Sequence, residues 1–202
     1  MERVHICPLN PEPEGPFRAR FGDEATDALL VYPRTALQRM SARLALTTAL
    51  GRKVELAAHP DGRPCIVGSQ LHISLSHTQT HVAAMVSRTV AGVDVQTVRP
   101  KLLTMLDRYL DEEEQHMALN GGLDAATALW CAKEAVYKAA VMAGLPFRDG
   151  IQVRGDIWAA DGFTAELIHA GHVRTYRLSA LRLTDAVAAY IVTGPKQEVT
   201  VL

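Results

Sequence analysis

Two segments about forty residues apart restrict most strongly how this chain can fold. Residues 92–96 (Gly-Val-Asp-Val-Gln) have the pattern of a strand, although Asp, here Asp94, is depleted from strands. Residues 130–139 have a helical pattern in which Glu134 and Lys138 lie one turn apart on one face, among small alanines. If the strand faces that helix, two carboxylates and an ammonium come together. Such a group can hold a hard divalent cation beside an anionic oxygen, as chemistry on a pyrophosphate requires.

Each of these side chains also has an interpretation without function. A Glu and a Lys four residues apart are common on solvent-exposed helix faces, and Asp94 can simply cap a turn. Buried charges, in contrast, persist where they are paired or bind a metal. Gln96 follows Asp94 on the same face of the strand and can offer a neutral oxygen to a metal, directly or through a bound water.

Polar side chains also close an earlier predicted strand, at residues 74–77 (Ser-Leu-Ser-His). The hydroxyl of Ser76, the imidazole of His77 and the backbone N–H groups there suit phosphate oxygens, but they are equally typical of a hairpin turn. The spacing of His72, His77 and His81 matches no common zinc site, so we exclude zinc.

Basic side chains that suit an anionic ligand occur in the first half of the chain. Arg34 and Arg43 lie on a predicted helix, and Arg63 lies in the turn Gly62-Arg63-Pro64. Most surface arginines are only solvated, so none of them indicates a site alone. The formal net charge is −1, and an anion must therefore be held by local side chains rather than by the overall charge.

The order of periodic segments and turn signals predicts helices followed by strands, twice. The predicted elements are a helix at 34–50, hairpin strands at 71–76 and 81–87, a strand at 90–95, a capping box at 111–114, a main helix from 124 to about 143, and strands at 151–153, 163–168, 176–183 and 186–193. This pattern predicts an α+β fold built as a pseudo-twofold pair of similar halves. We expect residues 1–91 and 92–202 to form the halves, with the active site in the cleft between them.

Composition excludes several function classes. The chain of 202 residues has no strongly basic character, which argues against nucleic acid as a partner. Its longest apolar runs, such as Ala186–Val192, are too short to cross a membrane, and no signal peptide is recognised. The three cysteines form no close pair, which is typical of free thiols in a reducing compartment, so we expect a cytoplasmic protein. The absence of a G-x-x-x-x-G-K-[ST] loop argues against a nucleoside-triphosphate phosphotransferase.

Four of these segments, taken in chain order, resemble the motifs of a known family. They are Gly62-Arg-Pro64, Ile73-Ser-Leu-Ser-His77, Gly92-Val-Asp94-Val and Trp130-Cys-Ala-Lys-Glu134-Ala-Val-Tyr-Lys138-Ala. The series is similar to the 4′-phosphopantetheinyl transferase superfamily, in its Sfp-type branch of two-half enzymes, over residues 34–147. The resemblance implies the fold of that superfamily and a monomer, because two halves in one chain complete the site.

The resemblance also implies an activity. Members of the holo-[acyl-carrier-protein] synthase type transfer the phosphopantetheine arm of coenzyme A to a serine of an acyl, peptidyl or polyketide carrier protein. They require magnesium and release adenosine 3′,5′-bisphosphate. The alternative is a catalytically impaired homologue that binds coenzyme A or a carrier protein without transfer.

Roles at the reacting centre follow from the resemblance residue by residue. It implies that Asp94 and Glu134 hold Mg²⁺, that Glu134 also acts as the base for the serine, and that Lys138 contacts the pyrophosphate. Gln96 stands where many members carry a third acid, and this departure is the feature that would fit an impaired homologue. Retention of the two acids and the lysine argues against impairment.

The remaining roles concern the nucleotide. The resemblance implies that Ser76 and His77 contact its phosphates and that Arg34 or Arg43 faces the 3′-phosphate. The Gly62-Arg63-Pro64 turn would border the adenine.

Overall fold

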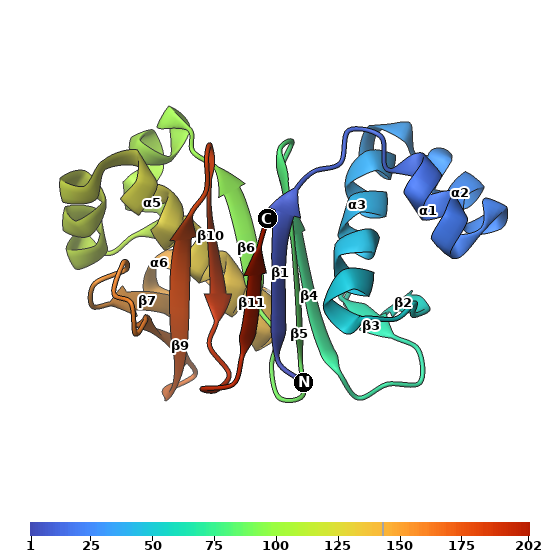
Figure 1. The fold of residues 1–202 in the computed structure, drawn as a ribbon. Helices are drawn as coiled ribbons and strands as arrows, with labels where there is room; N and C mark the ends of the chain where they lie inside the picture. Colours follow the sequence, from blue (N-terminus) through green and yellow to red (C-terminus); the bar gives the residue numbers. More distant parts are fainter. Residues whose placement is uncertain (143) are drawn as a thin grey trace.

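A first sheet of four strands has the order β11-β1-β5-β4 (Figure 1). The computed structural model describes residues 1–142 and 144–202, without the side chains of residues 33 and 34. The strands are β1 (Arg3–Pro8), β4 (His72–His77), β5 (His81–Ser87) and β11 (Glu198–Val201). Helix α3 (Pro33–Leu50) packs against this sheet and carries α1 (Glu14–Phe21) and α2 (Asp23–Leu30) on its far side. A separate pair of short strands, β2 (Leu56–Ala58) and β3 (Pro64–Ile66), adjoins β4.

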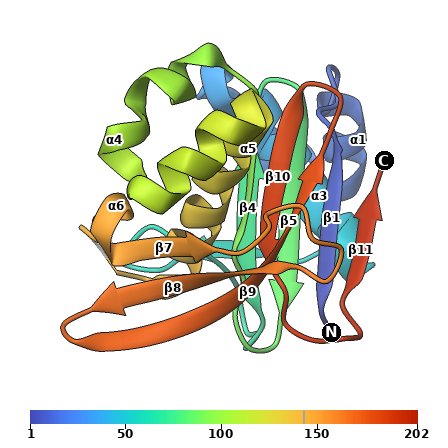
Figure 2. The same ribbon diagram turned by 90° about the vertical axis from the view of Figure 1, so that its left-hand side faces the viewer.

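A second sheet of five strands has the order β6-β10-β9-β8-β7, and all its pairs are antiparallel. Its strands are β6 (Val93–Thr97), β7 (Ile151–Arg154), β8 (Phe163–His169), β9 (His172–Arg182) and β10 (Ala186–Ile191). The 29-residue helix α5 (Glu112–Ala140) packs on β6 and β10, while β8 and β9 form a long hairpin (Figure 2). The shorter helices of this half are η1 (Pro100–Met105), α4 (Leu106–Tyr109) and α6 (Phe147–Gly150).

Strand β5 forms the wall between two hydrophobic cores. All seven of its residues are buried, and successive side chains of a strand point to opposite faces. Ala83 and Met85 belong to the core that contains α5, whereas Val82, Ala84 and Val86 belong to the core under α3. Accordingly, Figure 1 shows α3 and α5 on opposite sides of the molecule, with strands of the sheets between them. Burial on both faces explains why β5 is almost continuously apolar rather than alternating.

Several local predictions are confirmed. Helix α3 ends where Gly51 adopts a left-handed φ of 69°, and β4 and β5 pair as an antiparallel hairpin. Asp111 and Glu114 form the predicted capping box at the start of α5. Gly122 (φ 71°, ψ −156°) interrupts α5 and divides it into two helical segments. The predicted end of the main helix at about residue 143 lies outside the described residues.

The α+β class is therefore confirmed, while the division at residues 91 and 92 and the pseudo-twofold relation stay predictions. Strand β11 pairs in parallel with β1, so the end of the chain returns to the first sheet. Within the described ranges, no helix is both long and apolar enough to cross a lipid bilayer.

Candidate active site

The two sheets meet where β4 lies beside β6, and serine hydroxyls rather than a backbone ladder join them. The N–H of Val93 donates to Ser74 Oγ (3.1 Å) and the N–H of Val95 donates to Ser76 Oγ (3.3 Å). Alternation along β4 points both hydroxyls to the same face, toward β6. We call this line of contacts the seam, because it satisfies the free edge of β6 and fixes its position against the first sheet.

Asp94 lies at the seam with only 6% of its surface exposed. Its Oδ1 accepts hydrogen bonds from Ser76 Oγ and from Lys138 Nζ, both at 2.7 Å. The same ammonium donates to the carbonyl of Val93 (3.0 Å) and approaches that of Leu75 (3.5 Å). Lys138 thus joins α5 to β4 and β6, and the structure brings the predicted aspartate and lysine into direct contact.

Glu134 lies one helical turn before Lys138 and is partly buried. Its burial raises the pKa of the carboxyl, the negative charge of Asp94 raises it further, and Lys138 opposes both effects. Among the described residues, no protein group forms a hydrogen bond or ion pair with the Glu134 carboxylate. A partly buried carboxylate near Asp94 is therefore left available to a ligand.

The acidic side chains that could bind a metal at the seam are Asp94 and Glu134. The part of the chain that the structure describes contains no group of three or more His, Cys, Asp or Glu residues placed to hold a metal. Gln96 is partly buried on the same face of β6 as Asp94 and lines a pocket of about 260 Å³ that His77 also lines. Two carboxylates, one of them without a protein partner, fit a hard cation such as Mg²⁺, which usually keeps several waters and needs few protein ligands.

Ser76 and His77 lie together at the end of β4, but their side chains differ in surroundings. The Ser76 hydroxyl is buried and donates to Asp94, so the role it shows is to hold that carboxylate. The His77 side chain is exposed, and desolvation of its ring, with the charge of Lys138 second, lowers its pKa. His77 is therefore a neutral imidazole at neutral pH. Contact of either residue with phosphates stays a prediction.

Two pockets flank the Gly62-Arg63-Pro64 turn. One, of about 560 Å³, is lined by Arg43, Gly62, Pro64 and His77, and so collects four of the predicted ligand-binding residues. The other pocket, of about 420 Å³, is lined by residues far apart in the sequence, among them Arg63 near β3 and Lys138 on α5. Arg63 is ion-paired with Asp61 (2.9 Å). The side chain of Arg34 lies outside the described residues.

A comparison with protein families bears on this arrangement. The model described as the 4′-phosphopantetheinyl transferase superfamily matches residues 91–192, just over half of the chain. The matched segment begins next to β6 and ends after β10, so it contains Asp94, Glu134 and Lys138. The chain belongs to this superfamily. No curated protein has significant sequence similarity to it.

Membership shows that the protein is a transferase of the phosphopantetheinyl transferase kind. Members of this superfamily generally use coenzyme A, a divalent metal and a carrier protein. The Sfp-type branch is a finer assignment that the match does not distinguish. It stays a prediction.

Gly92 has a packing role in this phosphopantetheinyl transferase that sequence reasoning did not identify. A Cβ at this position would lie 2.2 Å from the carbonyl oxygen of Ala135 and 2.9 Å from Cδ1 of Ile191. Only glycine allows the backbone of β6 to approach α5 so closely. The glycine two residues before Asp94 therefore brings the aspartate within reach of Glu134 and Lys138, the residues on either side of Ala135 on that helix.

Arg39 is a second residue missing from the predicted site. It lies one turn before Arg43 on α3, and both line the pocket of about 560 Å³. Burial lowers the pKa of Arg43, and the charge of Arg39 lowers it further. The i, i+4 spacing of the two arginines is the signal that could have paired them. Two guanidinium groups at one pocket favour an anion there.

Proposed function

We propose that this transferase moves the phosphopantetheine arm of coenzyme A to a serine of an acyl, peptidyl or polyketide carrier protein, as a holo-[acyl-carrier-protein] synthase does. The reaction requires Mg²⁺ and releases adenosine 3′,5′-bisphosphate, and the protein acts as a monomer. The observation that carries the proposal is the meeting of Asp94, Glu134 and Lys138 at the seam, beside pockets lined by Arg39, Arg43 and Arg63.

Asp94 and Glu134 are the residues that hold the magnesium ion, with Gln96 contributing directly or through a water. When bound, the ion supplies neutralisation of charge on the pyrophosphate. Asp94 suits this role because Ser76 and Lys138 restrain its side chain. Glu134 suits it because its carboxylate has no protein partner among the described residues.

Glu134 also takes the proton of the attacking serine. The serine oxygen forms a bond to the β-phosphorus, and the bond from that phosphorus to the bridging oxygen breaks. The bridging oxygen leaves with the electron pair as part of adenosine 3′,5′-bisphosphate. A carboxyl whose pKa is raised by burial and by a neighbouring acid is a stronger base than an ordinary Glu, which favours this role. Lys138 stabilises the charge that develops on the leaving oxygen.

The nucleotide is held on the other side of the seam. Arg43, supported by Arg39, binds the 3′-phosphate through charge-assisted hydrogen bonds, and the Gly62-Arg63-Pro64 turn borders the adenine. His77 faces the same pocket as a neutral donor to the phosphates. Arg34 is the alternative ligand for the 3′-phosphate.

Mass spectrometry tests the proposal directly. Apo carrier proteins of the fatty-acid, polyketide and peptide classes are incubated with the enzyme, coenzyme A and Mg²⁺. We expect one of them to gain the mass of a single phosphopantetheine, and expect no gain with a chelator or after the carrier serine is replaced by Ala. If no carrier gains mass although calorimetry detects binding of coenzyme A, the impaired homologue is the correct description.

A further inference from the structure

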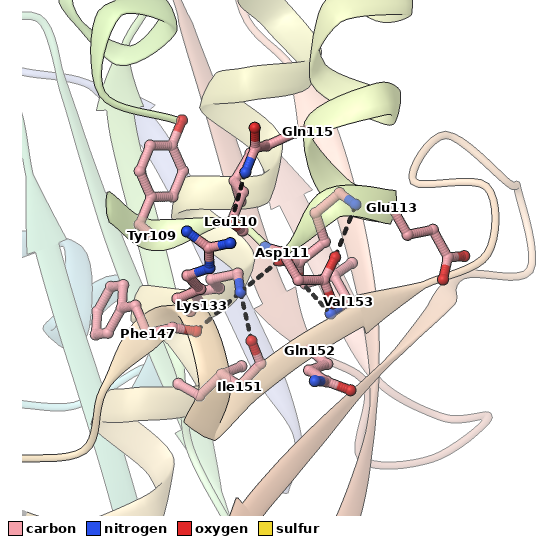
Figure 3. Close-up of polar contacts among 12 residues, drawn as sticks. Tyr109, Leu110, Asp111, Glu113, Gln115, Lys133, Phe147, Ile151, Gln152 and Val153 are labelled. Atoms are coloured by element: carbon pink, nitrogen blue, oxygen red, sulfur yellow. Dashed lines mark hydrogen bonds and ion pairs between the residues drawn. The ribbon is translucent and has the colours of Figure 1, made fainter. Parts of the chain in front are cut away.

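A buried ion pair lies behind the face of α5 that carries the site. Lys133 and Glu114 are both fully buried, and Lys133 Nζ lies 2.7 Å from Glu114 Oε2. The same ammonium donates to the carbonyls of Phe147 (2.9 Å) and Ile151 (Figure 3). Burial lowers the pKa of Lys133 and raises that of Glu114, and each partner's charge opposes the shift. None of these groups takes part in the proposed reaction.

Glu114 is itself fixed by the backbone of two elements. Its Oε2 accepts the N–H of Asp111 (2.8 Å) in the capping box, and its Oε1 accepts the N–H of Val153 (2.6 Å) in β7. Asp111 is in turn ion-paired with Arg154 at 2.8 Å. The ammonium of Lys133 therefore meets a rigid cluster formed by the start of α5, by α6 and by β7, in which every buried polar atom named here has a partner.

This cluster spans the interruption in α5. Gly122 is non-helical, so the hydrogen-bond ladder of the first segment does not by itself fix the rotation of the second. Glu114 belongs to the first segment and Lys133 to the second. Lys133 directly precedes Glu134 in the chain, and consecutive residues of a helix point in different directions. When Lys133 is held against the cluster, Glu134 is turned away from it, toward Asp94.

We propose that Lys133 is a positioning residue: its contacts with Glu114, Phe147 and Ile151 fix the rotation of the second segment of α5 so that Glu134 shares a divalent cation with Asp94. The inference rests on the proposed function for the identity of that ligand. A role in stability alone is a weaker explanation, because replacing a buried ion pair by well-packed hydrophobic residues of similar volume is often neutral or stabilising.

The test separates metal binding from stability. Lys133→Met combined with Glu114→Gln removes both charges, so no uncompensated charge is left in the core. Mn²⁺ affinity is measured by calorimetry and the urea midpoint by circular dichroism. We expect a lower midpoint, because the carbonyls of Phe147 and Ile151 lose their donor. Metal affinity should weaken by about tenfold or more, as is typical when the support behind metal ligands is lost. Turnover should fall by a larger factor than the KM for coenzyme A rises, because Arg39 and Arg43 lie on α3 and only Lys138 lies on the affected segment.

The matched control is Val86→Ala, which creates a small cavity in the core under α3 without touching α5. It should lower the urea midpoint and leave Mn²⁺ affinity within about twofold of wild type, since transfer of strain to α5 is not expected. Equal weakening of metal binding in the control and in the double variant would overturn the proposal. So would wild-type metal affinity in a folded double variant.

Three further results decide the remaining cases. If the double variant does not fold, Glu114→Gln alone decides: it weakens one of the three contacts of Lys133, and unchanged Mn²⁺ affinity would reject the positioning role. If the wild-type protein binds Mn²⁺ but modifies no carrier, the proposed function is wrong. The positioning role of Lys133 is then still tested by the Mn²⁺ affinities of the variants. A wild-type protein that binds no Mn²⁺ refutes both.

Discussion

The ammonium nitrogen of Lys138 lies 2.7 Å from Oδ1 of Asp94, the same oxygen that accepts the Ser76 hydroxyl. A divalent cation bound by Asp94 has to share this carboxylate with the lysine or displace it. In the proposed reaction the lysine therefore has two opposed effects, since it repels the metal and also stabilises negative charge on the pyrophosphate.

Replacing Lys138 with Met separates these effects. Without coenzyme A, metal affinity should rise, because the ammonium no longer competes with the ion for Asp94. Turnover should fall about 100-fold or more, because no cation then stabilises the leaving oxygen. Mn²⁺ titration and steady-state kinetics measure the two quantities. If both fall together, the main role of Lys138 is to hold α5 against the seam through the carbonyls of Val93 and Leu75.

Asp94→Ala and Glu134→Ala should each abolish transfer and leave the fold intact, because a magnesium site depends on few carboxylates. For Glu134 the loss of the base alone corresponds to a decrease of about 10²- to 10⁴-fold in turnover. Circular dichroism and carrier modification provide the measurements. Glu112→Ala, an exposed acid at the start of the same helix, is the control and should behave as wild type. Wild-type turnover in either site variant would reject the metal assignment.

Arg43→Ala should raise the KM for coenzyme A more than it lowers turnover, because the 3′-phosphate lies away from the bond that breaks. Loss of one charge-assisted bond, of about 1.5–3 kcal/mol, corresponds to a change in KM of roughly 10- to 100-fold. Dephospho-coenzyme A lacks that phosphate and should show a much smaller difference between variant and wild type. Equal losses with both substrates would transfer the role to Arg34 or Arg63.

Gln96→Glu should be tolerated and should lower the Mg²⁺ concentration required for half-maximal rate, because a third acid then faces the ion. Magnesium titration of the transfer rate measures this. Complete loss of activity would mean instead that Gln96 lies in a pocket that accepts only a neutral side chain, such as the one it lines with His77.

The stability of the protein should fall as pH decreases from neutral, in part because of His5. This side chain is 6% exposed, and burial lowers its pKa below the value in the unfolded chain. The unfolded state therefore binds the proton more readily, so the free energy of unfolding decreases as pH falls through the ordinary histidine pKa toward the lower folded value. Urea titrations between pH 8 and about 5 should show a weaker dependence for His5→Gln. Identical slopes would exclude the histidine as a source.

The features that were predicted correctly are those determined by a few consecutive residues. The end of α3 depends on the left-handed Gly51, and the β4–β5 hairpin depends on an alternating strand followed by a short apolar one. Both signals are visible in a few consecutive residues. Asp94 and Glu134 are noticeable in the sequence because their residue types are unusual in an apolar strand and in a largely buried helix. Their roles as metal ligands stay predictions.

Long-range contacts could not be predicted in this way. Lys133 and Glu114 become partners only after α5 folds back past Gly122, and the Ser76 hydroxyl meets Asp94 only when two sheets come together. The close approach of Gly92 to Ala135 is likewise a property of packing rather than of local sequence. Taken alone, each residue of these pairs could equally well occupy an ordinary surface or turn position, so its local sequence does not indicate its partner.

The parallel pairing of β11 with β1 limits how this protein can be divided for engineering. A fragment that stops before Glu198 would leave β1 as an open strand edge, and such an edge recruits other chains. A two-piece reporter cut between the sheets would carry β11 on the wrong piece. Its reassembly would therefore require strand exchange as well as docking. A second cut, in the connection between β10 and β11, would free the last strand. Joining that strand ahead of β1 through a linker that spans the sheet would then keep each sheet on a single piece.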